Sequence, residues 1–337
     1  MGMAIAKSDF SPREVSIETT FRCNLSCYWC FNKSVKAKPE LSTKNIKKIV
    51  DKVSQAGINV VRFTGGEPLL RKDIFELLEY AKSKNLFVLL NTNGTFVSEQ
   101  NIDIIKDCVD NVLVTFNGYD NLSEWKITGS KTSFEKKINA IKLLREYVKV
   151  VRIGTVAVKE NVKKLEEFFK VLKPLDVDAW EIFRPVPHGS RDLIDNSSVE
   201  TLVEKLIIFK MFVNTGVTNV LPFCSYEPGR VAQVCIGAVN DDGHSKIVIG
   251  TDGHAKPSYY FEKDLGNCLK EDIMDLWNNS FLVKIRNLKL APKLCKKCKY
   301  LEVCKGGSRY IAKKVNGSYA ALDPLAKPVK YRDLLFQ

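Results

Sequence analysis

Three cysteines stand close together near the start of the chain, at Cys23, Cys27 and Cys30 in the stretch CNLSCYWC. Three residues separate the first two thiols, and two residues separate the last two. A structural zinc site is normally closed by four ligands, and an odd number of thiols cannot all pair as disulfides. A [4Fe–4S] cluster held by three thiolates would keep one iron open to a small chelating molecule. A zinc site that borrows a distant ligand, or structural free thiols, are the alternatives.

The composition of the 337-residue chain predicts a globular protein with a sizeable core, because 45% of its residues are hydrophobic. No run of 18 apolar residues appears, so no transmembrane helix is expected. The first residues lack the apolar core of a signal peptide. We therefore expect a cytoplasmic protein, in which thiols stay reduced and clustered cysteines serve metal binding or catalysis.

The chain carries a net charge of +13, from 52 Lys and Arg residues against 39 Asp and Glu residues. Its lysines are spread along the sequence without forming a stripe. A lysine-rich solvated surface explains such a pattern, and an anionic partner is the alternative. Nucleic-acid binding gains little support from this distribution.

Short β-branched runs alternate with amphipathic helical patterns over residues 1–214. Alternation at this spacing predicts βα units and a parallel sheet. Six units are too few for a closed eight-stranded barrel, but they fit a partial (β/α)6 barrel of the TIM type. In such a barrel, catalytic groups belong at the C-terminal ends of the strands. The expected strands are 15–20, 59–66, 87–94, 111–118, 150–158 and 179–186.

Distinctive residues follow five of these expected strands. The three-cysteine loop follows the first strand, and each of four other strands ends in Gly, Asn, Thr or Pro. Each segment alone is explained by turn chemistry. Together, on one rim of a barrel, they predict one site. The four segments are TGGEP (Thr64–Pro68), NTNG (Asn91–Gly94), FNG (Phe116–Gly118) and RPVPHG (Arg184–Gly189).

The pattern changes after residue 214, which predicts a smaller α+β, cysteine-rich domain over residues 215–337. The stretch SKIVIGTDGHAKPS reads as a hairpin that turns at Thr251–Gly253. A short helix is expected at KEDIMDLWNNSF, and the stretch CKKCKYLEVCKGGS is rich in cysteine.

Over roughly residues 13 to 215, the sequence resembles the radical S-adenosylmethionine (SAM) enzymes. The resemblance rests on CNLSCYWC, with Trp29 before the last cysteine, on GGEP and on TNG. It implies that Cys23, Cys27 and Cys30 ligate a [4Fe–4S] cluster, whose open iron binds the amino and carboxylate groups of SAM. One electron from the cluster would cleave SAM to a 5′-deoxyadenosyl radical, which abstracts a substrate hydrogen.

The same resemblance assigns the GGEP turn to SAM. Gly65 and Gly66 would let the backbone approach the ligand. Glu67, or carbonyls near Pro68, would accept hydrogen bonds from the SAM ammonium group. Glu18 lies in the first strand and would be functional if it points inward.

Other residues of the rim would bind the rest of SAM. Asn93, together with Thr115 or Asn117, could bond the ribose hydroxyls. Val156 and the segment after the sixth strand could hold the adenine. Arg184 is a candidate for the SAM carboxylate because a guanidinium suits that geometry, and a surface ion pair is the alternative.

The second part resembles the SPASM or twitch extension, which holds one or two auxiliary iron–sulfur clusters. The matching cysteines are Cys235, Cys295, Cys298 and Cys304, the last three in the spacing C-x2-C-x5-C. The chain departs from the pattern at three positions where cysteine is expected, namely Ser258, Ser308 and Ala326. These losses remove most ligands of one auxiliary cluster and one ligand of the other.

At most one auxiliary cluster is therefore expected, held by Cys295, Cys298 and Cys304. Its fourth ligand could be Cys268, Cys235, Asp323 or the substrate, and we favour Cys268. Alternatively, the domain holds zinc through Cys268, or no metal. We interpret Cys108 and Cys224 as packing thiols.

The leading hypothesis is a radical SAM enzyme that acts on a peptide or on a cofactor precursor. A peptide would bind by strand addition at a sheet edge. Dehydrogenation of a small carbohydrate-like substrate is the alternative, and the early start of the barrel slightly favours a small molecule. A non-enzymatic iron–sulfur or zinc-binding protein would need neither GGEP nor TNG. The positive charge would suit an acidic electron donor such as flavodoxin or ferredoxin.

Overall fold

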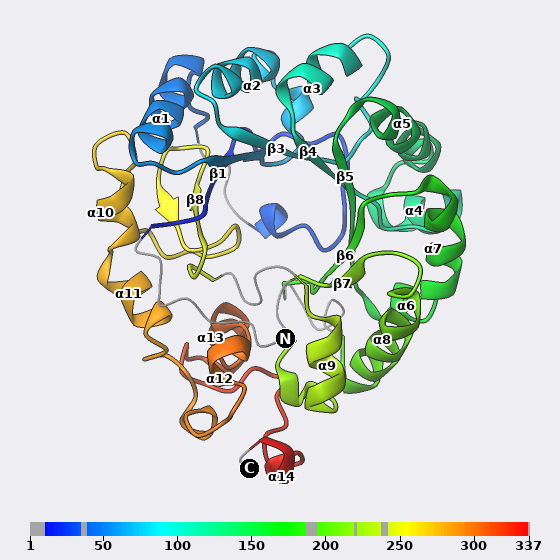
Figure 1. The fold of residues 1–337 in the computed structure, drawn as a ribbon, viewed down its shortest axis with the longest axis vertical. Coiled ribbons are helices and arrows are strands. Elements are labelled where there is room, and N and C mark those ends of the chain that lie inside the picture. Colours follow the sequence, from blue (N-terminus) through cyan, green and yellow to red (C-terminus); the bar gives the residue numbers. More distant parts are fainter. Residues whose placement is uncertain (1–10, 35–38, 187–193, 219–220, 237–241, 336–337) are drawn as a thin grey trace.

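The computed structural model of the chain describes residues 11–34, 39–186, 194–218, 221–236 and 242–335. Its centre is one curved sheet with the strand order β7-β6-β5-β4-β3-β2-β1-β8-β9 (Figure 1). Every neighbouring pair of strands from β7 to β8 is parallel, and β8 and β9 are antiparallel. The strands are β1 (Glu14–Glu18), β2 (Val60–Thr64), β3 (Phe87–Thr92), β4 (Asn111–Thr115), β5 (Val150–Val156), β6 (Ala179–Phe183), β7 (Thr215–Val217), β8 (Lys246–Ile249) and β9 (Ala255–Lys256).

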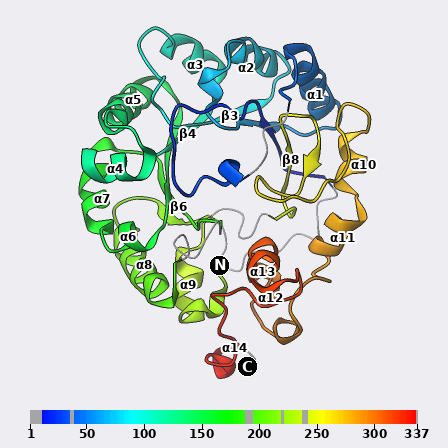
Figure 2. The ribbon, with the colours of Figure 1, turned by 180° about the vertical axis from the view of Figure 1, so that it is seen from behind.

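Helices cover the outer face of this sheet (Figures 1 and 2). The helices that follow β1 to β6 are α1 (Thr43–Gln55), α2 (Ile74–Ser83), α3 (Ile102–Cys108), α4 (Asn121–Thr128), α5 (Ser133–Tyr147), α6 (Lys159–Val162), α7 (Leu165–Leu172) and α8 (Asn196–Phe209). The partial barrel expected from the strand–helix alternation is confirmed. The amphipathic helix α1 is an example of how a helix packs on the sheet. Ser42 caps its first turn, and Ile46 and Ile49 are buried in the core.

The two faces of the strands differ in chemistry, as alternation along a strand requires. In β1, Val15 and Ile17 belong to the hydrophobic core. Glu14 is the first residue of this strand. It accepts two hydrogen bonds from the guanidinium of Arg62, at 2.6 and 2.8 Å. This pair holds the pKa of the Glu14 carboxyl well below its usual range, although burial opposes the shift. Charged side chains therefore lie on the face of β1 and β2 opposite the hydrophobic core.

The sheet continues past residue 214, where a separate domain was expected to begin. β7 extends one edge by pairing with β6, with Thr215 opposite Trp180. β8 extends the other edge by pairing with β1, with Ile247 opposite Val15. The hairpin expected around Thr251–Gly253 is confirmed, because β8 and β9 pair antiparallel. Strands from both sides of the expected boundary thus share one sheet.

The C-terminal part lies across the open side of the ring of helices (Figures 1 and 2). Its helices are α9 (Pro228–Val234), α10 (Ile273–Trp277), α11 (Ser280–Arg286), α12 (Leu301–Cys304), α13 (Arg309–Asn316) and α14 (Arg332–Leu335). One helix was expected over residues 270–281, but the chain forms two, because Asn279 turns and caps α11 by accepting from the N–H of Phe281. In the described part of the chain, no helix is long and apolar enough to cross a bilayer.

Candidate active site

The three clustered cysteines lie on the loop that leads from β1 to the short 3-10 helix Phe31–Ser34. The backbone of this loop is bound to the end of α4, where Ser26 N donates to Thr128 O at 2.8 Å and Tyr28 N donates to Ile127 O at 3.2 Å. Within the loop, Cys30 N donates to Cys27 O at 3.1 Å. A loop held at these points keeps its thiols on one side of the strand ends.

The thiols of this loop lie within electrostatic reach of one another. Burial raises the pKa of Cys27 to about 12, and negative charge on Cys30 or Cys23 would raise it further, while Lys137 opposes the shift. Partial desolvation also raises the pKa of Cys23, which lies at the exposed end of the group, and Glu67 and Cys30 add to the effect. Three thiols on one short loop are a donor set that a cationic iron–sulfur core would bind as thiolates. The residues present therefore fit the cluster.

The GGEP turn holds the cysteine loop from the other side. Gly66 N donates to Thr20 O at 2.6 Å, and Glu67 N donates to Arg22 O at 2.8 Å. A Cβ on Gly65 would come 2.4 Å from Thr20 O, and one on Gly66 would come 2.2 Å from Arg22 O. We expected these glycines to admit a ligand, but their open sides face the chain itself, because the loop backbone packs there. The turn acts as the second anchor of the loop.

Glu67 is completely buried and already engaged. Its carboxylate accepts from Thr92 Oγ1 at 2.7 Å, from Asn93 N at 2.6 Å and from Leu69 N at 3.1 Å. Burial raises its pKa, and the three donors oppose that shift. Glu67 therefore binds the end of β3 to the GGEP turn. Pro68, which follows it, starts a short 3-10 helix.

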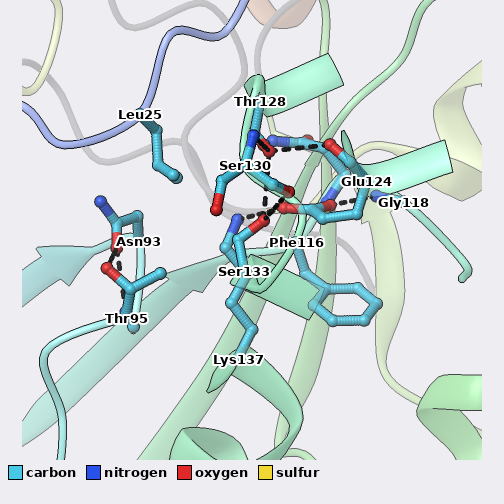
Figure 3. A network of polar contacts seen from close by, with 12 residues as sticks. Leu25, Asn93, Thr95, Phe116, Gly118, Glu124, Thr128, Ser130, Ser133 and Lys137 are labelled. Atoms are coloured by element: carbon cyan, nitrogen blue, oxygen red, sulfur yellow. Dashed lines mark hydrogen bonds and ion pairs between the residues drawn. The ribbon is translucent and has the colours of Figure 1, made fainter. Parts of the chain in front are cut away.

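Asn93 connects the end of β3 to the first cysteine. Its Nδ2 donates to Asn24 Oδ1 at 2.9 Å and lies 3.9 Å from Cys23 Sγ, while its Oδ1 accepts from Thr95 (Figure 3). Leu25 N also donates to Cys23 Sγ, at 3.4 Å. Hydrogen bonds to a ligand sulfur tune the potential of an iron–sulfur cluster. The amide of Asn93 is thus fixed by contacts within the loop.

Asn117 and Val156 meet at the ends of β4 and β5. Asn117 is completely buried, and its Oδ1 accepts from Val156 N at 2.8 Å. Asn161 Nδ2 in turn donates to Val156 O at 2.7 Å, so the side chain of Val156 is the part left for contact. Among the described residues, Asn117 Nδ2 has no hydrogen-bond partner. A buried donor without a partner is costly, so this amide is available to donate to a polar ligand. Thr115, half-buried, is the last residue of β4.

A buried ion pair that the sequence did not predict lies below this rim. Lys137 Nζ and Glu124 Oε1 are 2.6 Å apart, and both side chains are completely buried. The carboxylate of Glu124 also accepts from Gly118 N at 2.6 Å (Figure 3). Thr128 Oγ1 donates to Glu124 O, one turn before the carbonyl that holds the cysteine loop. No local sequence pattern predicts this pair, because Glu124 belongs to α4 and Lys137 belongs to α5.

Arg184 forms a buried ion pair, and Glu18 forms a partly buried one. Arg184 Nη1 donates to Asp323 Oδ2 at 2.8 Å, so the candidate for the SAM carboxylate is neutralised by another carboxylate. The alternative of a surface ion pair also needs correction, because the pair is buried. Glu18 binds Lys256 of β9 at 2.7 Å. Residues 187–189 of RPVPHG lie outside the described residues.

A second group of cysteines lines one cavity in the C-terminal part. Its lining includes Cys224, Cys295, Cys298, Cys304 and Ala326. Cys268, the favoured fourth ligand, is buried elsewhere, and the charged groups that act on its thiol are Lys52, Asp272 and Glu271. The structure thus brings Cys224 to the C-x2-C-x5-C group and does not bring Cys268. Cys108 is buried in the hydrophobic core, in keeping with a packing thiol.

The two serines at expected cysteine positions occupy a different environment. Ser308 caps α13 by accepting from Ile311 N, and its Oγ donates to Asp242. Ser258 is buried. Between the hairpin and α13, aromatic rings pack together, among them Tyr260, Phe261, Tyr310 and Tyr319. In the described part of the chain, no three Cys, His, Asp or Glu side chains stand close enough to share a single metal ion.

The parallel sheet and the cysteine loop after β1 define an α/β partial barrel with a thiol cluster at the strand ends. Residues 17–172 match the model of the radical SAM superfamily, and residues 232–299 match SPASM, described as an iron–sulfur cluster-binding domain. The chain therefore belongs to the radical SAM enzymes that carry a SPASM domain. Enzymes of this family use a [4Fe–4S] cluster together with SAM, and SPASM domains bind auxiliary iron–sulfur clusters.

Known proteins resemble the chain over nearly its whole length. An AdoMet-dependent heme synthase of Oleidesulfovibrio alaskensis is 26% identical, with 96% of this chain and 90% of the relative covered. A PqqA peptide cyclase of Gluconobacter oxydans is 26% identical, with 97% and 93% covered. The crystal structure of Streptococcus suis SuiB bound to S-adenosylmethionine has a TM-score of 0.77 at 18% identity, with 94% of this chain and 77% of that chain covered. The last likeness concerns the fold.

Proposed function

We propose that Cys23, Cys27 and Cys30 hold the cluster of this radical SAM enzyme and that the adjoining strand ends bind SAM. The observation that supports this proposal is the position of the cysteine loop. Backbone hydrogen bonds attach the loop to the GGEP turn on one side and to the end of α4 on the other. When bound, the cluster and SAM supply one-electron cleavage of SAM and abstraction of a substrate hydrogen. The chain's own residues position these groups.

The residues at the strand ends have two roles in this proposal: some hold the cysteine loop in place, and we call these anchors, whereas others contact SAM. Glu67 and Asn93 are anchors, because their polar atoms are already bonded to the ends of β3 and to the cysteine loop. We assign the SAM ammonium to carbonyls of Gly65 or Gly66 and not to the engaged carboxylate of Glu67. Asn117 Nδ2, with Thr115 beside it, donates to the nucleoside, and the Val156 side chain covers the adenine.

Arg184 is left out of the SAM site in this proposal, since its guanidinium is bound to Asp323. Residues 215–337 supply the cavity lined by cysteines and close the open side of the barrel. We treat residues 1–214 and 215–337 as the two functional halves, although they share the sheet.

The substrate class that we propose is a peptide or a cofactor precursor. Relatives named as a PqqA peptide cyclase and as a heme synthase, both aligned over almost the whole chain, support these two classes. The net charge of +13 favours an acidic one-electron donor such as flavodoxin or ferredoxin. None of the ten cysteines forms a disulfide in the structure, which suits the reducing cytoplasm.

Cleavage of SAM by the anaerobically reconstituted and reduced protein tests the proposal. We expect the wild type to form 5′-deoxyadenosine and methionine, and Cys27→Ala to form neither. Cys108→Ala is the matched control, because this thiol is buried in the core of the barrel and should leave cleavage intact. Cleavage that survives Cys27→Ala, or a wild type that contains iron and cleaves no SAM, would refute the assignment.

A further inference from the structure

Four cysteines line the cavity in the C-terminal part, although only three belong to one sequence motif. Cys295, Cys298 and Cys304 come from the C-x2-C-x5-C stretch, and Cys224 comes from the short 3-10 helix Phe223–Ser225. Ala326, where the SPASM pattern has its last cysteine, lines the same cavity. The cavity therefore contains both Ala326, the position at which the pattern has lost a cysteine, and Cys224, a cysteine that the pattern does not include.

Backbone contacts fix Cys224 between the motif and Ala326. Phe223 N donates to Cys304 Sγ at 3.4 Å, which sets the turn against the last cysteine of the motif. On the other side, Lys327 N donates to Cys224 O at 3.2 Å. The residue next to Ala326 is thus bonded directly to Cys224. This arrangement places the Cys224 thiol where a cysteine at position 326 would reach.

The electrostatics of the four thiols agree with this geometry. Burial raises the pKa of Cys224 to about 12, and negative charges on Cys304, Cys295 and Cys298 all add to the shift. Burial likewise raises the pKa of Cys295 to about 11, with Cys304 as the next cause. Cys224 thus lies within electrostatic reach of all three cysteines of the motif, in keeping with the cavity that the four residues line. On ligation each thiol releases its proton.

The other candidates for a fourth ligand fit less well. Both carboxylate oxygens of Asp323 are engaged, by Arg184 and Ser308 N on one side and by Leu325 N on the other. Cys235 is affected by the charge of Cys304 but does not line the cavity. Cys268 lies under the hairpin, where its N–H donates to Gly253 O at 2.9 Å.

We propose that Cys224 is the fourth thiolate of an auxiliary [4Fe–4S] cluster held by Cys295, Cys298 and Cys304, replacing the ligand lost at Ala326. This cluster is closed by four protein thiolates, so all of its irons are liganded by protein and none is open to substrate. The proposal goes beyond the SAM site and does not depend on it.

The test uses the full chain with Cys23, Cys27 and Cys30 changed to Ala, so that only the auxiliary site remains. After anaerobic reconstitution, we expect about four irons per chain in this background. Adding Cys224→Ser should lower the content to about three after mild oxidation and produce the EPR signal of a [3Fe–4S] cluster, because one iron lacks its thiolate. Cys235→Ser and Cys268→Ser are the matched controls and should retain the full cluster.

A rescue variant separates loss of a ligand from loss of folding. In the Cys224→Ser background, Ala326→Cys should restore about four irons, because it returns a thiolate to the same cavity. A Cys224→Ser protein that keeps an intact cluster overturns the proposal, and so does loss of iron in Cys268→Ser alone. A background protein that contains no iron, or zinc in its place, also overturns it. These readouts do not depend on SAM cleavage, so they are independent of the proposed function.

Discussion

Arg184 and Asp323 form an ion pair in which Nη1 and Oδ2 lie 2.8 Å apart and the side chains are 1% and 0% exposed. Arg184 directly follows β6, whereas Asp323 lies 139 residues further along the chain. The carboxylate also accepts from Ser308 N and Leu325 N. The pair therefore joins the end of a barrel strand to the segment that carries Ala326 beside the cysteine cavity.

Breaking this pair should be far more costly than breaking an exposed one. Asp323→Asn removes the carboxylate that pairs with the buried guanidinium of Arg184, so we expect a loss of about 3–5 kcal/mol in the free energy of unfolding. Glu262→Gln, which breaks the exposed pair with Lys314, should cost less than about 1 kcal/mol. Anaerobic urea unfolding of both variants measures the difference. Equal losses would mean that the buried pair contributes no more than surface charge.

Gly66→Ala tests the role of the GGEP turn as an anchor. The new Cβ would come 2.2 Å from Arg22 O, so the cysteine loop must move. We expect the protein to lose the cluster at Cys23, Cys27 and Cys30, a decrease of about four irons per chain, and to keep the auxiliary iron. Gly229→Ala is the control, since nothing lies within 4 Å of its Cβ. Unchanged iron in Gly66→Ala would show that the loop tolerates displacement.

The sequence predicted those parts of the site that local patterns encode. The cysteine spacing and the turns after successive strands were enough to place Cys23, Glu67 and Asn117 at one end of the sheet. Parallel βα units bring consecutive strand ends to the same edge, so their order along the chain gives their order in space. The hairpin near Thr251 was equally local.

Contacts between distant segments were missed for the same physical reason. The partner of a buried charge depends on which elements pack together, so nothing near Glu124 pointed to Lys137 in the next helix. Cys224 stands apart from any cysteine motif, and only its packing against Cys304 brings it to the cavity. The close approach of Gly66 to the chain itself also follows from tertiary packing.

The charge of Lys137 should influence the cluster that we assign to the first cysteine group. Lys137 favours the anionic form of Cys27, and Glu124 opposes it. Lys137→Met removes a positive charge and leaves the negative one, so we expect the reduction potential to fall by tens of millivolts, on the order expected for one partly buried charge. The measurement is an EPR-monitored redox titration, in which the SAM-binding cluster is recognised by its change on adding SAM.

A double variant supplies the control for this effect. Glu124→Gln combined with Lys137→Met removes both charges, so the potential should return close to that of the wild type. It also relieves the buried uncompensated carboxylate of the single variant, which separates an electrostatic effect from a folding defect. The same potential in Lys137→Met and wild type would contradict the prediction.

Two buried thiols, Cys268 and Cys224, should respond differently to iron. Burial raises the pKa of Cys268 to about 11 and that of Cys224 to about 12, so both are protonated at neutral pH. Alkylation by iodoacetamide requires the thiolate and access to it, so its rate at the buried Cys268 should be low and should rise with pH between about pH 7 and 9. Peptide mass spectrometry measures both sites in one sample.

Iron loading distinguishes the ligand from the packing thiol in this experiment. We expect reconstitution to suppress alkylation of Cys224, because a coordinated thiolate is no longer a free nucleophile. Cys268 should react at the same rate with and without iron, since its neighbours are Lys52, Asp272 and Glu271 and not the other thiols. If iron instead suppressed alkylation of Cys268 and left that of Cys224 unchanged, Cys268 would be the fourth ligand and Cys224 a packing thiol.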